Sequence, residues 1–135
     1  MTFIIFDTNV LVSSMLSRNI PFKLFNEYLN GRLYILYSSA IMREYYEVLN
    51  RDKFPFPAWM VEVLIDEIEK YGFKINPIPT NVDFKDKTDK KFYDLLSHCS
   101  SVNTYLVTGN KKDFPIDSRI VSPSEMIEIL NDTIF

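Results

Sequence analysis

Four acidic residues lie in separate segments of the chain, directly after an expected strand, within an expected helix or in the loop after another strand: Asp7, Glu44, Asp89 and Asp113. Carboxylates gathered from separate segments repel one another unless a cation lies between them. Oxygen ligands without histidine or cysteine select Mg²⁺ or Mn²⁺ over zinc or copper. A divalent ion held in this way favours hydrolysis of a phosphodiester bond, because it activates water and neutralises charge on the phosphate.

Each of these acids also has a structural interpretation when it is taken alone. Asp7 could cap the first helix, and Asp89, with Asp86 as a second candidate, could be an acid that the helix dipole favours. Glu44 could be an ordinary surface glutamate, and Asp113 could be a turn residue before a proline. A metal site is favoured by the coincidence of all four with one fold and one crevice.

The elements that must position these acids alternate between strands and helices. Strands are predicted at 2–6, 33–37, 73–76, 104–108 and 119–121. Helices are predicted at 10–17, 21–30, from Ser38 or Ser39 to about 50, 58–71, 88–99 and 123–131. This order predicts an α/β fold in three layers, with a parallel sheet of four or five strands and strand 2–6 in its centre. Right-handed crossovers then place a functional crevice at the carboxyl ends of the strands.

The bulk composition fits one domain over residues 1–135 that acts in the cytoplasm. Hydrophobic residues make up 47% of the chain, which is enough for a sizeable core without disulfides. The single cysteine, Cys99, cannot form an internal bridge, which favours a reducing compartment. We expect no signal peptide, since the apolar start is short and lacks a basic leader, and no membrane span.

Four blocks of sequence, in this order, resemble the PIN-domain nucleases, and among them the VapC-like toxins of prokaryotic toxin–antitoxin pairs. The blocks are Ile5-Phe6-Asp7-Thr8-Asn9-Val10-Leu11-Val12-Ser13, the segment 38–51 around Arg43-Glu44-Tyr45, Asp86-Lys87-Thr88-Asp89-Lys90-Lys91-Phe92, and the segment 106–115 around Thr108-Gly109-Asn110. The resemblance implies a flavodoxin-like sheet, cleavage of RNA, frequent homodimers and control by a cognate antitoxin protein.

The resemblance also implies roles for single residues. It makes Asp7, Glu44 and Asp89 metal ligands, with Asn9 and Asp86 as supporting residues. In the last block, the family places an acid either directly after Thr-Gly or three residues later, which are Asn110 and Asp113 here. An amide is a poorer Mg²⁺ ligand than a carboxylate, so Asp113 is taken as the fourth ligand and Asn110 as a hydrogen-bonding residue.

Lysines accompany the last two acids, although the net charge of −3 argues against a simple electrostatic binder of nucleic acids. Lys87 and Lys90 lie beside Asp89, and Lys111 and Lys112 precede Asp113. These lysines are either a solvated surface or contacts for the phosphates that flank the cleaved bond. A lysine carries no base-reading fork, so they predict no sequence preference.

Other functions compete with a metal-dependent ribonuclease. An aspartyl phosphatase would need a second acid where Asn9 stands, and a receiver domain would need an acceptor aspartate that is missing. The main rival is a PIN-fold module that binds RNA or protein without cleaving it. His98 is interpreted as a helix-face or core residue, and Trp59 as core or as a protein-binding surface.

Overall fold

A computed structural model describes residues 1–132 and contains a five-stranded parallel sheet in the order β3-β2-β1-β4-β5. The strands are β1 (Phe3–Phe6), β2 (Tyr34–Tyr37), β3 (Phe73–Lys74), β4 (Thr104–Val107) and β5 (Ile120–Val121). Phe3 pairs with Tyr34 on one side of β1 and with Thr104 on the other. The predicted parallel sheet, with the first strand in its centre, is confirmed.

Six helices lie in the described residues 1–132: α1 (Thr8–Leu16), α2 (Ile20–Leu29), α3 (Ser39–Leu49), α4 (Ala58–Tyr71), α5 (Lys90–His98) and α6 (Pro123–Asp132). Local chemistry explains several of their ends. The side chains of Asn19 and Ser38 accept hydrogen bonds from the backbone N–H groups of Phe22 and Ile41, which caps α2 and α3. Just beyond α2, Gly31 takes a φ of 77°, a conformation that glycine adopts without strain.

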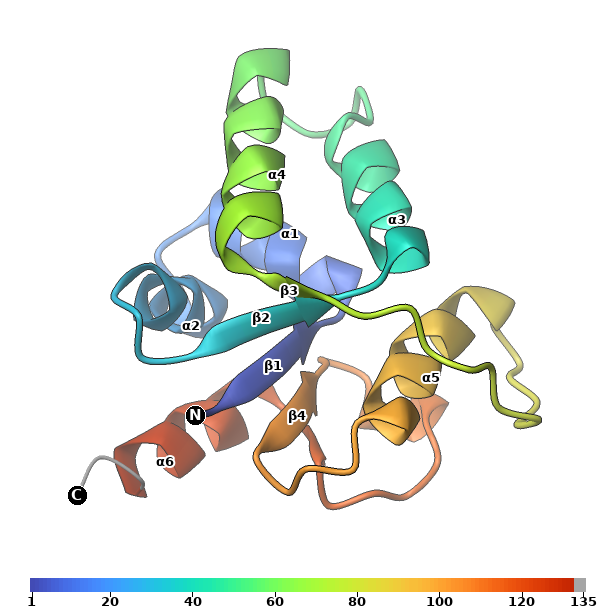
Figure 1. Cartoon of the computed structure of the whole chain (residues 1–135). Helices are drawn as coiled ribbons and strands as arrows, with labels where there is room; N and C mark the ends of the chain where they lie inside the picture. The colour runs from blue at the N-terminus through green and yellow to red at the C-terminus, as the bar shows by residue number, and fades with distance from the viewer. Residues whose placement is uncertain (133–135) are drawn as a thin grey trace.

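The helices cover both faces of the sheet, which gives the predicted three layers (Figure 1). The chain moves from β1 outward to β3 through α1–α4, and it then crosses back to β4 through α5. Because crossovers between parallel strands are right-handed, α1–α4 cover one face and α5 covers the other. The amino-terminal ends of α3 and α5 therefore approach the same edge of the sheet, beyond the carboxyl ends of β1 and β4.

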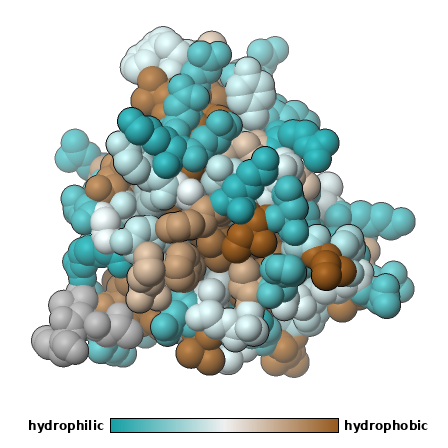
Figure 2. All heavy atoms as spheres, in the orientation of Figure 1, coloured by the Kyte–Doolittle hydropathy of each residue, from teal (hydrophilic) through white to brown (hydrophobic). Residues whose placement is uncertain are grey.

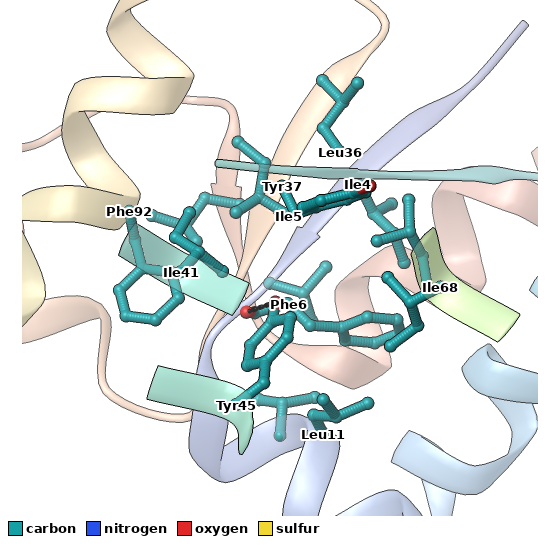
Figure 3. Packing of buried hydrophobic residues seen from close by; sticks show 14 of the residues in the cluster. Ile4, Ile5, Phe6, Leu11, Leu36, Tyr37, Ile41, Tyr45, Ile68 and Phe92 are labelled. Carbon is teal, nitrogen blue, oxygen red and sulfur yellow. Dashed lines mark hydrogen bonds between the residues drawn. The ribbon is translucent and has the colours of Figure 1, made fainter. Parts of the chain in front are cut away.

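The core is centred on β1, whose Ile4, Ile5 and Phe6 are fully buried. Figure 3 shows Phe6 among side chains from the surrounding elements, with the ring of Tyr45 of α3 close by. The hydroxyl of Tyr45 donates a hydrogen bond to the backbone carbonyl of Phe6. This bond fixes α3 against the end of β1, immediately before Asp7.

Some element boundaries differ from the sequence prediction. The helix expected over 88–99 is a 3₁₀ turn, Lys87–Asp89, followed by α5, so Asp89 lies before the first full α-helical turn. The edge strand expected over 73–76 is only two residues long, and both are exposed. His98 is exposed, which agrees with the helix-face interpretation. Trp59 is 68% exposed, so the core interpretation of this residue is wrong.

Apolar side chains gather near the middle of the face in Figure 2, surrounded by hydrophilic ones. Among the aromatic residues of the sheet, Phe3, Tyr34 and Phe73 form mutual ring contacts with centroids 5.6 to 5.8 Å apart. No helix within residues 1–132 has both the length and the apolar composition that a membrane span requires.

Candidate metal centre

Asp7 leaves the carboxyl end of β1 and is tied to the neighbouring strand. The hydroxyl of Thr108, the first residue after β4, donates a 2.7 Å hydrogen bond to Oδ2 of Asp7. Thr108 is fully buried. Asp7 occupies the N-cap position of α1, but its side chain makes no capping hydrogen bond. The strongest contact of the carboxylate is thus across the ends of β1 and β4, with Thr108.

The environment of Asp7 disfavours its negative charge. Burial raises the pKa of Asp7, and the nearby carboxylate of Glu44 raises it further. The hydrogen bond from Thr108 and the backbone N–H groups of Thr8 and Asn9 act in the opposite direction, but the net pKa stays raised. A cation at this position would relieve both unfavourable contributions.

Glu44 lies in the second turn of α3 and is held by two donors from other elements. The hydroxyl of Thr8, a buried residue directly after Asp7, donates to Oε2 of Glu44. Oε1 of Glu44 accepts a 2.7 Å bond from the ammonium group of Lys91 on α5. The two side chains of this ion pair are only 18% and 22% exposed. Glu44 is therefore not the ordinary surface glutamate that its sequence position allowed.

The pKa of Asp89 responds to the charges of Asp7 and Glu44 and of two further acids. Burial raises the pKa of Asp89 to about 6, with further contributions from Asp86, Asp7, Asp113 and Glu44 in that order. Charges influence one another in this way only over short distances. Acids from four other positions, Asp86, Asp7, Asp113 and Glu44, therefore add to the negative potential at Asp89. Asp113 is the most exposed of the predicted four and lies in a 3₁₀ turn, Lys111–Asp113.

The acids within residues 1–132 do not form a finished coordination shell. Among residues 1–132, no group of three or more His, Cys, Asp or Glu side chains is arranged to hold a metal ion. The oxygens of Glu44 are instead bound to Thr8 and Lys91, and one oxygen of Asp7 is bound to Thr108. The donor chemistry still fits a hard divalent cation, since every candidate ligand is a carboxylate.

Comparison with known protein families gives one match. The family model described as the PIN domain matches residues 3–112. The chain belongs to the PIN domain family. No curated protein and no solved structure matches the chain. PIN domains are generally nucleases and typically use divalent metals. The match covers the segments of Asp7, Glu44 and Asp89 and ends one residue before Asp113.

The supporting residues that were predicted for this PIN domain have structural partners. The carboxylate of Asp86 accepts bonds of 2.9 and 2.7 Å from the backbone N–H and hydroxyl of Thr88, and so caps the 3₁₀ turn Lys87–Asp89. The backbone N–H of Asn110 donates to the hydroxyl of Thr108, whereas its side chain makes no capping bond. Asn9 is exposed, one residue beyond Thr8.

The predicted RNA-contacting lysines are divided between paired and exposed positions. Lys90 forms a 2.8 Å ion pair with Asp94, and Lys111 forms a 2.8 Å ion pair with Glu125. Lys87 and Lys112 are exposed. The cation in direct contact with a candidate ligand is Lys91, which was not among the predicted contacts.

Sequence reasoning therefore missed three residues of this PIN domain: Thr8, Thr108 and Lys91. Each contacts a predicted ligand that is 36, 101 or 47 residues away in the chain. Thr8 and Thr108 could have been suspected, because Thr108 ends the predicted strand 104–108 and Thr8 follows Asp7 just beyond the predicted strand 2–6. No local signal in the sequence distinguishes Lys91 from Lys90. In the structure the two side chains have different partners, Glu44 for Lys91 and Asp94 for Lys90.

Proposed function

We propose that this PIN domain is an endoribonuclease that depends on Mg²⁺ or Mn²⁺, with Asp7, Glu44, Asp89 and Asp113 as its metal ligands. The observation that carries the proposal is the position of Asp7 and Glu44, held by Thr108 and Thr8 beyond the carboxyl end of β1, together with the effect of both carboxylates on the pKa of Asp89. Ligands in parallel α/β sheets bind outside this edge. Membership of a family of nucleases supports the same reaction class.

The bound cation would lower the pKa of a water molecule and neutralise charge on the scissile phosphate. The protein's own residues orient the ligands and bind the substrate. Thr108 holds Asp7 and Thr8 holds Glu44, so both carboxylates are restrained before metal or RNA arrives. In-line attack of water on phosphorus breaks the bond to the 3′-oxygen, which leaves a 5′-phosphate and a 3′-hydroxyl. Exposed Lys87 and Lys112 would contact flanking phosphates.

A cleavage assay on a single-stranded RNA tests this proposal. The assay compares the wild type, Asp7→Asn and Asp66→Asn with Mg²⁺, with Mn²⁺ and with a chelator. Asp66 is an exposed acid on α4 and serves as the charge-matched control. We expect cleavage by the wild type and Asp66→Asn only when metal is present, and no cleavage by Asp7→Asn. Wild-type protein that binds RNA but never cleaves it would support the alternative, a catalytically inactive binding module.

We further propose that the chain is the toxin of a toxin–antitoxin pair and acts in the cytoplasm as a single domain over residues 1–135. The four-block resemblance to VapC-like toxins supports this role. A protein partner is also supported by an apolar groove of about 520 Å³ between α2 and α4, away from the acids. Leu29 and Val63 line this groove and are 52% and 61% exposed.

The toxin role is tested by controlled expression in a bacterial host, with growth and intact RNA as readouts. Expression of the wild type should arrest growth and that of Asp7→Asn should not. Co-expression of the protein encoded beside the gene should restore growth, and Val63→Glu should weaken that rescue. If Val63→Glu instead converts a dimer into a monomer in light scattering, the groove is an interface between two copies.

A further inference from the structure

The ammonium group of Lys91 lies inside the acidic region rather than at its margin. It donates to Oε1 of Glu44 at 2.7 Å and to the backbone carbonyl of Thr88 at 2.5 Å. The side chain is only 22% exposed. Because Thr88 belongs to the 3₁₀ turn that carries Asp89, this one cation links the helix of Glu44 to the segment of Asp89.

The other lysines near the site do not have this position. Lys90 is directed to Asp94, and Lys85 is exposed in the preceding loop. Lys91 is therefore the cation among residues 1–132 that forms an ion pair with a candidate ligand. It neutralises part of the repulsion that folding creates when several carboxylates meet without a metal.

We propose that Lys91 is a positioning residue that occupies the place of the metal: it holds Glu44 in the metal-free protein and must release it before a divalent cation can bind. This inference rests on the proposed metal-dependent function. Two observations lead to it. Glu44 is already bound through both of its oxygens, and the acids as they stand form no ready coordination shell within residues 1–132. The ammonium group of Lys91 takes up the space beside Oε1 of Glu44, and its positive charge repels a divalent cation from that position.

The proposal predicts opposite effects of one substitution on metal binding and on metal-free stability. Lys91→Met should bind Mn²⁺ about tenfold more tightly than the wild type, within the range typical of coupling between two sites. Without metal, its melting temperature should fall, since Glu44 loses its counter-ion. Lys91→Arg should restore both properties towards wild-type values. A role limited to packing would lower stability without raising metal affinity.

The experiment is calorimetric titration of Mn²⁺ into each protein, together with thermal melts in a chelator. Lys85→Met removes the same charge from an exposed position and should change Mn²⁺ affinity by less than about twofold, because screening weakens distant charges. In a Glu44→Gln background, Lys91→Met should no longer raise Mn²⁺ affinity, because the ion pair that it breaks is already absent. Lys91→Gln, whose amide can still donate a hydrogen bond, replaces Lys91→Met if that variant does not fold.

The outcomes separate this inference from the proposed function. Equal or weaker Mn²⁺ binding by Lys91→Met overturns the inference, even if the wild type cleaves RNA. Tighter binding by Lys91→Met with no cleavage of RNA by any variant supports the inference and refutes the ribonuclease activity. If neither the wild type nor Lys91→Met binds Mn²⁺, both are refuted, and Lys91 is a permanent partner of Glu44.

Discussion

Replacing Asp7 with asparagine should remove catalysis while leaving the metal-free protein as stable as before, or slightly more stable. The hydrogen bond from Thr108 can be kept, because the amide oxygen of asparagine also accepts. A bond to a neutral acceptor is weaker than one to a carboxylate, by about 1 kcal/mol. Against this cost, burial and the charge of Glu44 together raise the pKa of Asp7 despite its hydrogen bonds. The ionised carboxylate is therefore a net cost to folding, and we expect Asp7→Asn to gain up to about 1 kcal/mol.

The response to metal should differ more than the metal-free stability does. A ligand supplied at about 100 times its Kd stabilises the folded state by about 2.7 kcal/mol. For a chain of this length, 1 kcal/mol corresponds to about 4 °C in Tm, so saturating Mg²⁺ should raise the wild-type Tm by about 10 °C. Asp7→Asn loses a charged ligand from the centre of the sheet and should gain only a small part of this increase.

Thermal melts of both proteins with Mg²⁺ and with a chelator measure these differences at a fixed pH. Cleavage of a single-stranded RNA, followed in parallel, reports the chemistry. Equal Mg²⁺ shifts and equal cleavage in the two proteins would refute the assignment of Asp7 as a ligand. A large loss of metal-free stability in Asp7→Asn would refute the claim that its charge is a cost to folding.

Three further substitutions test the surroundings of the site. Thr108→Val should keep the fold but weaken Mg²⁺ binding about tenfold in calorimetry, because Asp7 loses its orienting donor; unchanged affinity would mean that this bond is only structural. Asp94→Asn should lower the free energy of unfolding in urea at pH 7 by about 1 kcal/mol. Burial raises the pKa of Asp94, but donors including Thr80 lower it overall, so the wild type should lose its advantage below about pH 4. A difference between the two proteins that does not change with pH would contradict this account. Tyr45→Phe should cost about 1–2 kcal/mol, because a buried carbonyl at the end of β1 loses its donor; an unchanged urea midpoint would count against that bond.

The fold was predictable because most of its determinants are local. Buried strands are short apolar runs, and α3 and α4 place their apolar residues at helical spacing on one face. Predictions were least accurate where the structure depends on distant contacts. The short edge strand β3 is one example, because only its pairing with Leu36 and Tyr37 defines it. The 3₁₀ turn before α5 is another, and the local pattern does not separate it from the helix that follows.

The candidate site was predictable only to the level of residue type and sheet edge. Asp7 could be placed at the carboxyl edge of the sheet because it directly follows the predicted central strand, and the predicted topology brings the end of β4 next to it. The direction of a side chain follows from neighbours that are distant in the sequence. Asp7 shows the same limit: its position before α1 suggests a helix cap, and only the structure reveals that Thr108, 101 residues away, donates to its carboxylate.

A site of clustered carboxylates imposes a requirement on the metal-free protein that the donors around it meet. Like charges in a partly buried region would favour unfolding or protonation, so the chain needs positive or donating groups in the same place. Thr8, Thr108 and Lys91 supply them, each from an element other than that of the carboxylate it contacts. The two hydroxyls can keep a carboxylate oriented while its other lone pairs bind a metal, because each oxygen accepts more than one bond. An ammonium group cannot share its place with a divalent cation in this way. The three donors should therefore behave differently on metal binding, with the threonine contacts retained and the lysine contact broken.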